Sequence, residues 1–298
     1  MTGRFVTGPP PPPGSAGPLR VEAVHGRTFG SSGPYTPHDV DYFTDLLAMY
    51  GSAPDAELID TGRTTFREMV RGLLPDLRHL ASGFDVAILA HVAPDAEPGW
   101  PGPALVEAVN GAGITFALSE LGPTVSFAAV ELVLGELYPA PRGRALVWLL
   151  DQAAVQHRAC VPEGLRVDRS RAVVVSFSRD GAVGGSTAAH AVCPDRDAAA
   201  EWLEASLHAA AQGESGLTVV CPPALLGLVC GLPSVGEVIL GPAGQPCTGP
   251  WSAFLDHLPD WRRAGRRVAL ADYDQALGYA GLCVVDVAPL PVTSGGVP

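Results

Sequence analysis

Unbroken apolar runs and segments with helical spacing alternate along most of the chain. Residues 84–91 (FDVAILAH) and 144–150 (RALVWLL) are continuous apolar runs, typical of strands covered on both faces. Between them, residues 124–137 repeat apolar side chains every three or four positions, as an amphipathic helix does. The apolar positions of that helix are Val125, Ala128, Ala129, Leu132 and Val133. The pattern therefore predicts an α/β fold in which helices cover buried strands.

The order of predicted elements in the first part of the chain recurs in the second part. Further strands are predicted at residues 20–25, 114–118, 217–221, 237–240 and 266–270, and further helices at residues 64–80, 101–110, 222–230 and 250–258. Three pairs of segments match in the same order: FDVAILAHVAP with GLTVVCPPALL, GPTVSFAAVEL with TGPWSAFLDHL, and RGRALVWLL with AGRRVALAD. The repetition predicts two similar halves, each a mixed sheet with packed helices. A Rossmann domain has no support, because no GxGxxG follows a predicted strand.

The two halves are predicted at residues 19–168 and 169–290, with a tail at each end. Residues 1–18 and 291–298 are poor in large apolar side chains, and Pro and Gly recur in them, so we expect both to be flexible. Residues 216–236 are uncharged and long enough to imitate a membrane span, but they contain three prolines. We therefore expect a buried strand followed by a short helix there.

Composition and charge narrow the range of partners. The chain has 298 residues, of which 47% are hydrophobic and 17% charged, as in a globular protein. Its 19 basic and 31 acidic residues give a net charge of −12, which argues against nucleic acid or an anionic membrane as a partner. Every basic residue is arginine, so a Walker A lysine and a Schiff-base lysine are excluded.

Cysteine and histidine spacings predict neither a disulfide framework nor a metal site, because no CxxC pair and no ligand spacing is present. We expect the cysteines to act as small apolar residues in a reducing compartment. The N-terminal residues have no apolar segment typical of a secretory signal, so the predicted location is cytoplasmic. The six cysteines are Cys160, Cys193, Cys221, Cys230, Cys247 and Cys283.

Residues 84–151 resemble a known family. Their succession FDVAILA, ALVEAVN, ITFALSE, VSFAAVELVLGEL and RALVWLLD is similar to the ketoacyl-acyl carrier protein synthase III branch of the thiolase-fold condensing enzymes. Residues 168–180 resemble the strand that opens the second half in that family, and residues 266–285 resemble its closing hairpin. The resemblance implies a thiolase-like α/β fold with two pseudo-duplicated halves. It also implies a nucleophile position at the start of the first long helix.

The three catalytic positions implied by this resemblance do not carry the family's residues. Active members have a Cys-His-Asn set, with the cysteine at a helix N-terminus, where the helix dipole lowers the thiol pKa. Here the cysteine position falls on Gly122, the histidine position on Cys221, and the asparagine position on Gln245 or Cys247. The comparison therefore implies that the catalytic set is lost.

Three functions are compatible with a thiolase fold that lacks this set. The first is a catalytically degenerate subunit that supports an active ketosynthase partner in secondary-metabolite or fatty-acyl/polyketide biosynthesis. The second is an acyltransferase that moves an acyl group from coenzyme A or acyl carrier protein to an amine or alcohol with a non-standard nucleophile. The third is a protein that binds an acyl thioester without reacting.

The expected partners follow from the same resemblance. They are a ketosynthase-like protein or a second copy of the chain, and an acyl carrier protein as thioester donor. In the family the dimer forms across the strand before the nucleophile, here residues 114–118. We expect no cofactor beyond a coenzyme A or carrier-protein thioester as substrate.

Three residues around the predicted nucleophile turn are candidates for the remaining chemistry. Ser119 and Ser126 could accept an acyl group, although serine commonly caps turns and helices. Glu120 could act as a general base or contact a partner, or it could be structural.

Three further candidates come from the second half. Cys221 could be a displaced nucleophile or a small buried residue. Cys247 opens the last predicted helix, where the dipole favours a thiolate. His190 is the best-placed base in that half, with a structural histidine as the alternative.

Overall fold

The computed structural model describes residues 19–60, 62–77, 83–99, 105–106, 113–135, 143–154, 161–211 and 216–290. The predicted tails at residues 1–18 and 291–298, Cys160, and most of the predicted helix at residues 101–110 lie outside these ranges.

The described elements alternate between strands and helices along the chain. The first group is β1 (Arg20–Phe29), α1 (Pro37–Ala48), α2 (Ala56–Asp60), α3 (Phe66–Leu73), η1 (Leu74–Leu77), β2 (Val86–His91), β3 (Ile114–Leu118), η2 (Gly122–Thr124), α5 (Val125–Leu134), β4 (Arg144–Asp151), η3 (Glu163–Leu165) and β5 (Ser170–Ser178). The second group is β6 (Gly184–Val192), α6 (Arg196–Ala211), β7 (Leu217–Cys221), η4 (Pro223–Leu225), α7 (Leu226–Val229), β8 (Val235–Leu240), α8 (Gly249–Ala264), β9 (Arg266–Asp274) and β10 (Tyr279–Val287).

The described strands form one sheet in the order β3-β2-β4-β5-β1-β6-β10-β9-β7-β8. Its two five-stranded parts have the same plan. In the first part β2 lies parallel between β3 and β4, and β4, β5 and β1 are antiparallel. In the second part β7 lies parallel between β8 and β9, and β9, β10 and β6 are antiparallel. The predicted α/β fold of two similar units of mixed sheet is confirmed.

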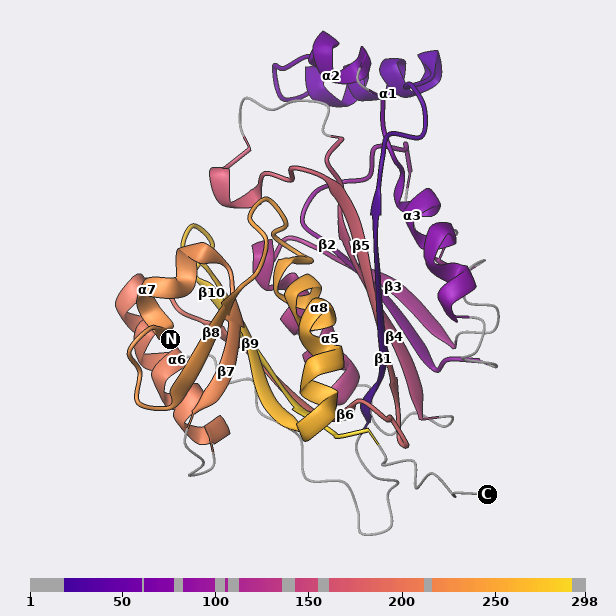
Figure 1. Cartoon of the computed structure of the whole chain (residues 1–298). Helices are drawn as coiled ribbons and strands as arrows, with labels where there is room; N and C mark the ends of the chain where they lie inside the picture. Colours follow the sequence, from indigo (N-terminus) through magenta and orange to yellow (C-terminus); the bar gives the residue numbers. More distant parts are fainter. Residues whose placement is uncertain are drawn as a thin grey trace, which may run out of the picture.

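Helices α5 and α8 lie between the two five-stranded parts (Figure 1). One buried cluster joins apolar side chains of both helices to the inner faces of both parts. On β4, for example, Val147 and Leu149 point into this layer, whereas Trp148 points to the opposite face and packs with α3. Helices α6 and α7 cover the outer face of the second part. The layers are therefore helix, sheet, helix, sheet and helix.

Two glycines let the central helices approach the sheet closely. A Cβ atom at Gly281 of β10 would lie 2.6 Å from the Phe127 side chain of α5. A Cβ atom at Gly26 of β1 would lie 2.8 Å from Leu255 of α8. Because side chains at these glycines would push the helices away, the two positions fix where each helix lies on the strands.

The predicted element boundaries differ from the structure in places. The helix predicted at residues 64–80 begins at Phe66, because Thr65 and Glu68 form a capping box at its N-terminus. Residues 216–236 contain β7, η4 and α7 and reach into β8, as expected from the prolines. No prediction covered α1, β6 or α6; β6 (GGSTAAHAV) has few large apolar side chains, so it lacks the signal of a buried strand.

The strand order also bears on where the two halves meet. Strand β5 pairs with β4 and β1, and it occupies the place that β10 occupies in the second part. By strand order β5 thus corresponds to β10. The predicted domain boundaries themselves stay predictions. Within the described ranges no helix has the length and apolar character needed to cross a bilayer.

Candidate functional site

A group of buried polar side chains lies in the central layer, between the first turns of α5 and α8. Its carboxyl groups come from the ends of the central strands: Asp151 ends β4, and Asp272 and Asp274 lie at the end of β9. All three residues are buried. We call them the carboxyl cluster.

Asp151, from the other half, binds the two residues that lead into α8. The Asp151 carboxylate accepts the backbone N–H groups of Cys247, at 3.0 Å, and Thr248, at 2.8 Å. It also accepts the Thr248 hydroxyl at 2.7 Å. Burial raises the pKa of Asp151 to about 6, and the hydrogen bonds from Thr248 and Cys247 limit the rise. At neutral pH Asp151 is therefore mostly ionised, and it satisfies the buried N–H groups of the two residues before α8.

Asp272 differs from Asp151 in its protonation state. Burial, followed by the nearby charges of Asp274 and Asp151, raises the pKa of Asp272 to about 8, against a hydrogen bond from the Tyr273 N–H. At neutral pH Asp272 is therefore mostly protonated while Asp151 is mostly ionised. Two neighbouring carboxyl groups with separated pKa values can serve as a proton donor and an acceptor.

The first turn of α5 has a different set of partners. Thr124, the N-cap residue, is fully buried, and its hydroxyl lies 3.0 Å from the Nε2 atom of His190 on β6. The hydroxyl also lies 2.7 Å from the Leu121 carbonyl oxygen. Neither Thr124 nor Thr248, the N-cap residue of α8, makes a capping hydrogen bond with its side chain. The first turn of α5 thus carries a hydroxyl that donates to a backbone carbonyl and contacts an imidazole.

The predicted nucleophile position, Gly122, lies two residues before this hydroxyl. Gly122 has a φ of +54°, and a Cβ atom there would lie 2.1 Å from the Asp274 carboxylate. The position therefore requires glycine and offers no side chain. Sequence counting missed Thr124, and the chain gives no local signal for its pairing with His190, which is 66 residues away.

His190 is half-buried, and burial lowers its pKa, so the imidazole is neutral at pH 7. Its ring lies 5.2 Å from the ring of Tyr279, and its strand pairs it with Gly281 of β10. The sequence singled out His190 as the best-placed base of the second half without a partner. The structure provides that partner, Thr124.

The two candidate cysteines are both fully buried. Cys247 lies just before α8, but burial and the Asp151 charge raise its thiol pKa well above its usual range. The expected dipole-stabilised thiolate is therefore opposed by burial. Cys221 ends β7 with its side chain among the apolar residues under α6 and α7, on the outer face of the sheet. Burial and the Asp272 charge raise its thiol pKa to about 12.

The three candidates around the turn are not joined to the Thr124–His190 pair by any hydrogen bond among the described residues. Ser119 is half-buried between β3 and η2. Glu120 is exposed and has a φ of +68°, a strained conformation for a residue with a side chain. Ser126 is fully buried within α5, and its hydroxyl has no hydrogen-bond partner among the described residues.

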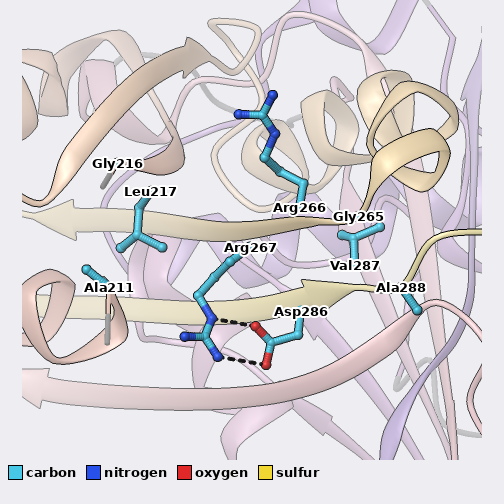
Figure 2. A pocket seen from close by; sticks show the side chains of 9 residues that line it. All are labelled: Ala211, Gly216, Leu217, Gly265, Arg266, Arg267, Asp286, Val287 and Ala288. Carbon is cyan, nitrogen blue, oxygen red and sulfur yellow. Dashed lines mark hydrogen bonds and ion pairs between the residues drawn. The ribbon is translucent and has the colours of Figure 1, made fainter. Parts of the chain in front are cut away.

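A surface cavity of about 580 Å³ lies at the other end of β9, away from the carboxyl cluster (Figure 2). Its two arginines already have acidic partners: Arg267 pairs with Asp286, and Arg266 lies 3.7 Å from Glu237. The cavity therefore offers little unpaired charge to a ligand. Within the described part of the chain, no group of three or more His, Cys, Asp or Glu side chains is arranged to hold a metal ion.

Comparison with known proteins places the chain by its fold. No protein-family model and no curated protein matches the sequence. Among solved structures, the 3-oxoacyl-(acyl-carrier protein) synthase of Burkholderia xenovorans LB400 aligns with a TM-score of 0.60 and 12% identity over 92% of this chain and 95% of its own. The tetronic acid condensing enzyme AbyA1 aligns with a TM-score of 0.61 and 13% identity, over 90% of this chain and 99% of its own. The acyltransferase ChlB3 aligns with a TM-score of 0.61 and 11% identity, over 92% of this chain and 98% of its own.

These alignments confirm the predicted thiolase-like fold of the ketoacyl synthase III type. At 11–13% identity they establish the fold and not the reaction. The predicted loss of the Cys-His-Asn set stays a prediction, as do the roles of the candidate residues.

Proposed function

We propose that this chain is a thiolase-fold subunit that does not itself catalyse cysteine-dependent condensation and that supports an active ketosynthase-like partner. The products of such a pair would be fatty-acyl, polyketide or other secondary-metabolite chains. In such a pair the partner carries out the condensation, and this chain supports it as a second subunit of the same fold.

One observation carries the proposal: no cysteine among the described residues stands at the first turn of α5. A thioester is attacked by the thiolate, not the thiol. With pKa values of about 12, the Cys221 and Cys283 thiols would be ionised to only about one part in 10⁵ at pH 7. Burial also raises the pKa values of Cys193 and Cys247. Cysteine-dependent acylation therefore lacks a nucleophile at this site.

The exposed edge of the first five-stranded part supports a partner. Among the strands of the described residues, β3 is outermost and pairs only with β2, and Ile114 at its start is 52% exposed. An uncovered edge strand offers unpaired N–H and C=O groups to another chain. Because η2 and the Thr124 turn follow β3 directly, a partner on this edge would lie beside the site.

The test compares the two outer edges of the sheet. Sedimentation velocity is measured for the wild-type chain, alone and with a purified ketosynthase, and for Ile114→Asp on β3. Leu240→Asp is the matched control, since Leu240 lies on the opposite edge strand, β8, and is 46% exposed. We expect Ile114→Asp to weaken association at least about tenfold, and Leu240→Asp to leave it within about twofold, because a buried charge at an interface is costly.

Condensation is measured on the same samples with acetyl-coenzyme A and malonyl-acyl carrier protein. We expect no 3-oxoacyl product from this chain alone. Product formed by the purified chain without a partner, or equal effects of the two edge variants, would contradict the proposal.

A second candidate function is acyl transfer from a thioester to an alcohol or amine. The observation that favours it is the fold shared with the acyltransferase ChlB3, at a TM-score of 0.61. Acyl transfer requires no decarboxylation, so it is compatible with the absence of condensation.

A further inference from the structure

Helix α1 carries apolar side chains on its outer face as well as on its inner face. On the inner face, Phe43 is buried and packs with Tyr35. On the outer face, Tyr42 is 41% exposed, and Met49, the C-cap residue, is 74% exposed. Tyr50, in the turn that follows, is 77% exposed. Large apolar side chains that gather on a surface are typical of a place where another molecule binds.

Tyr42 and Met49 lie on one line along the helix. They are seven residues apart, close to two turns, and exposed Asp45 lies between them. We call Tyr42, Asp45 and Met49 the outer stripe. The buried residues Asp39 and Phe43 lie on another side of the helix. Since apolar residues seven apart recur along the seam between packed helices, the shape of the outer stripe fits a second helix.

The surroundings of the outer stripe are acidic. Residues 34–60 contain six acidic side chains and no arginine. One of the six, Asp39, forms an ion pair with Arg63, and no ion pair among the described residues involves the other five. Two of these five, Asp41 and Asp45, are exposed on α1 itself. Negative charge around an apolar stripe favours a partner that carries basic side chains around its own apolar stripe.

A second copy of this chain does not have that charge. Each copy has a net charge of −12, and two α1 helices packed along their outer stripes would bring the two Asp45 carboxylates together. The stripe is also a different surface from the β3 edge. Helix α1 lies beyond one end of the sheet, whereas β3 runs along its side (Figure 1).

We propose that the outer stripe of α1 is a docking surface for a basic amphipathic helix of another protein. Apolar side chains of that helix pack on Tyr42, Met49 and Tyr50, and its arginines or lysines face the surrounding carboxylates. The proposal goes beyond the function above, because it adds a second protein-binding surface and defines the charge of its partner.

The probe is a fluorescein-labelled helical peptide of leucine and lysine, with its leucines on one face. Its binding to the full chain is measured by fluorescence anisotropy at physiological ionic strength. The charge control is the same peptide with glutamate in place of every lysine. We expect the basic peptide to bind at least about tenfold more tightly than the acidic one, because like charges repel.

Tyr42→Ser combined with Met49→Ser tests the apolar part of the stripe. We expect the affinity for the basic peptide to fall at least about tenfold, since two apolar side chains no longer lose water on binding. Leu240→Ser combined with Leu290→Ser is the matched control. It removes two exposed apolar side chains elsewhere and leaves the affinity within about twofold. Circular dichroism verifies that each variant is folded.

Asp41→Asn combined with Asp45→Asn tests the acidic part. We expect the affinity to fall at least about fivefold and its dependence on salt to weaken. Glu201→Gln combined with Glu204→Gln, on the exposed face of α6, removes the same net charge elsewhere. This control leaves the affinity within about twofold, since charges far from the stripe are screened.

Three results overturn the proposal. One is that the basic peptide does not bind, or binds the stripe variants as tightly as the wild type. Another is an equal loss in the two pairs of charge variants, which would mean attraction to net charge alone. The third is self-association of the wild type, seen by sedimentation velocity and abolished by the stripe variants, which would assign the stripe to a second copy. The β3 and β8 variants test a different surface, so failure here is distinguishable from failure of the partner proposal.

Discussion

The starts of α5 and α8 are the same structural place in two halves of one fold, and they have diverged in chemistry. Each helix follows an outer parallel strand and begins with a buried threonine. At α8 the threonine and two backbone N–H groups bind Asp151. At α5 the threonine hydroxyl instead donates to the Leu121 carbonyl and contacts His190. The comparison teaches that duplication supplied two equivalent buried threonines, of which one is bound to a carboxylate and the other contacts an imidazole.

The largest expected contrast comes from placing the same thiol at both helix starts. In Thr124→Cys the thiol lies beside the His190 imidazole, which can accept its proton and so lowers the pKa of the thiol. In Thr248→Cys it lies against the ionised Asp151, which raises its pKa. We expect alkylation by iodoacetamide at pH 7, mapped by peptide mass, to be about 1000-fold faster in Thr124→Cys. Equal rates would show that the two ends do not differ electrostatically.

The next effect tests whether Asp151 has a structural role. In Asp151→Ala two backbone N–H groups and one hydroxyl lose their buried acceptor. We expect the free energy of unfolding to fall by about 3 kcal/mol, since unsatisfied buried donors are costly. Urea denaturation at pH 7 measures it, with exposed Asp41→Asn as the control. A loss below about 1 kcal/mol would mean that the α8 end does not depend on this carboxylate.

An effect of similar size is expected in the pH dependence of stability from Asp272. Its folded pKa is about 8, and an unfolded aspartic acid has a pKa of about 4, so the folded state holds this proton more tightly. Stability therefore falls as pH rises through that window, by at most about 1.4 kcal/mol per pH unit. Asp151, with a pKa of about 6, contributes in the same direction below pH 6.

Asp272→Asn isolates this contribution, because asparagine stays neutral at every pH. We expect the variant to lose stability less than the wild type when urea denaturation is repeated from pH 5 to pH 8. Parallel curves for the two proteins would contradict a raised pKa at Asp272.

Much of the fold was predictable because buried strands and amphipathic helices have local signatures. The runs at residues 84–91 and 144–150 became β2 and β4, and the repeated segments became equivalent parts of two half-sheets. Strand β6 escaped prediction because its small and polar residues carry no burial signal. That omission mattered, since His190 lies on β6 and only its pairing with β10 brings it to α5.

The sequence by itself determined the alternation of elements, the duplicated order and the absence of a cysteine at the first turn of α5. These are local properties of composition and spacing, so they need no knowledge of contacts. Tertiary structure alone decided that Cys221 points to the outer face of its sheet, that Asp151 binds the residues leading into α8 of the other half, and that Thr124 meets His190. The physical reason is that strand register and packing between the halves set the direction of each polar side chain, and both depend on residues far apart in the chain.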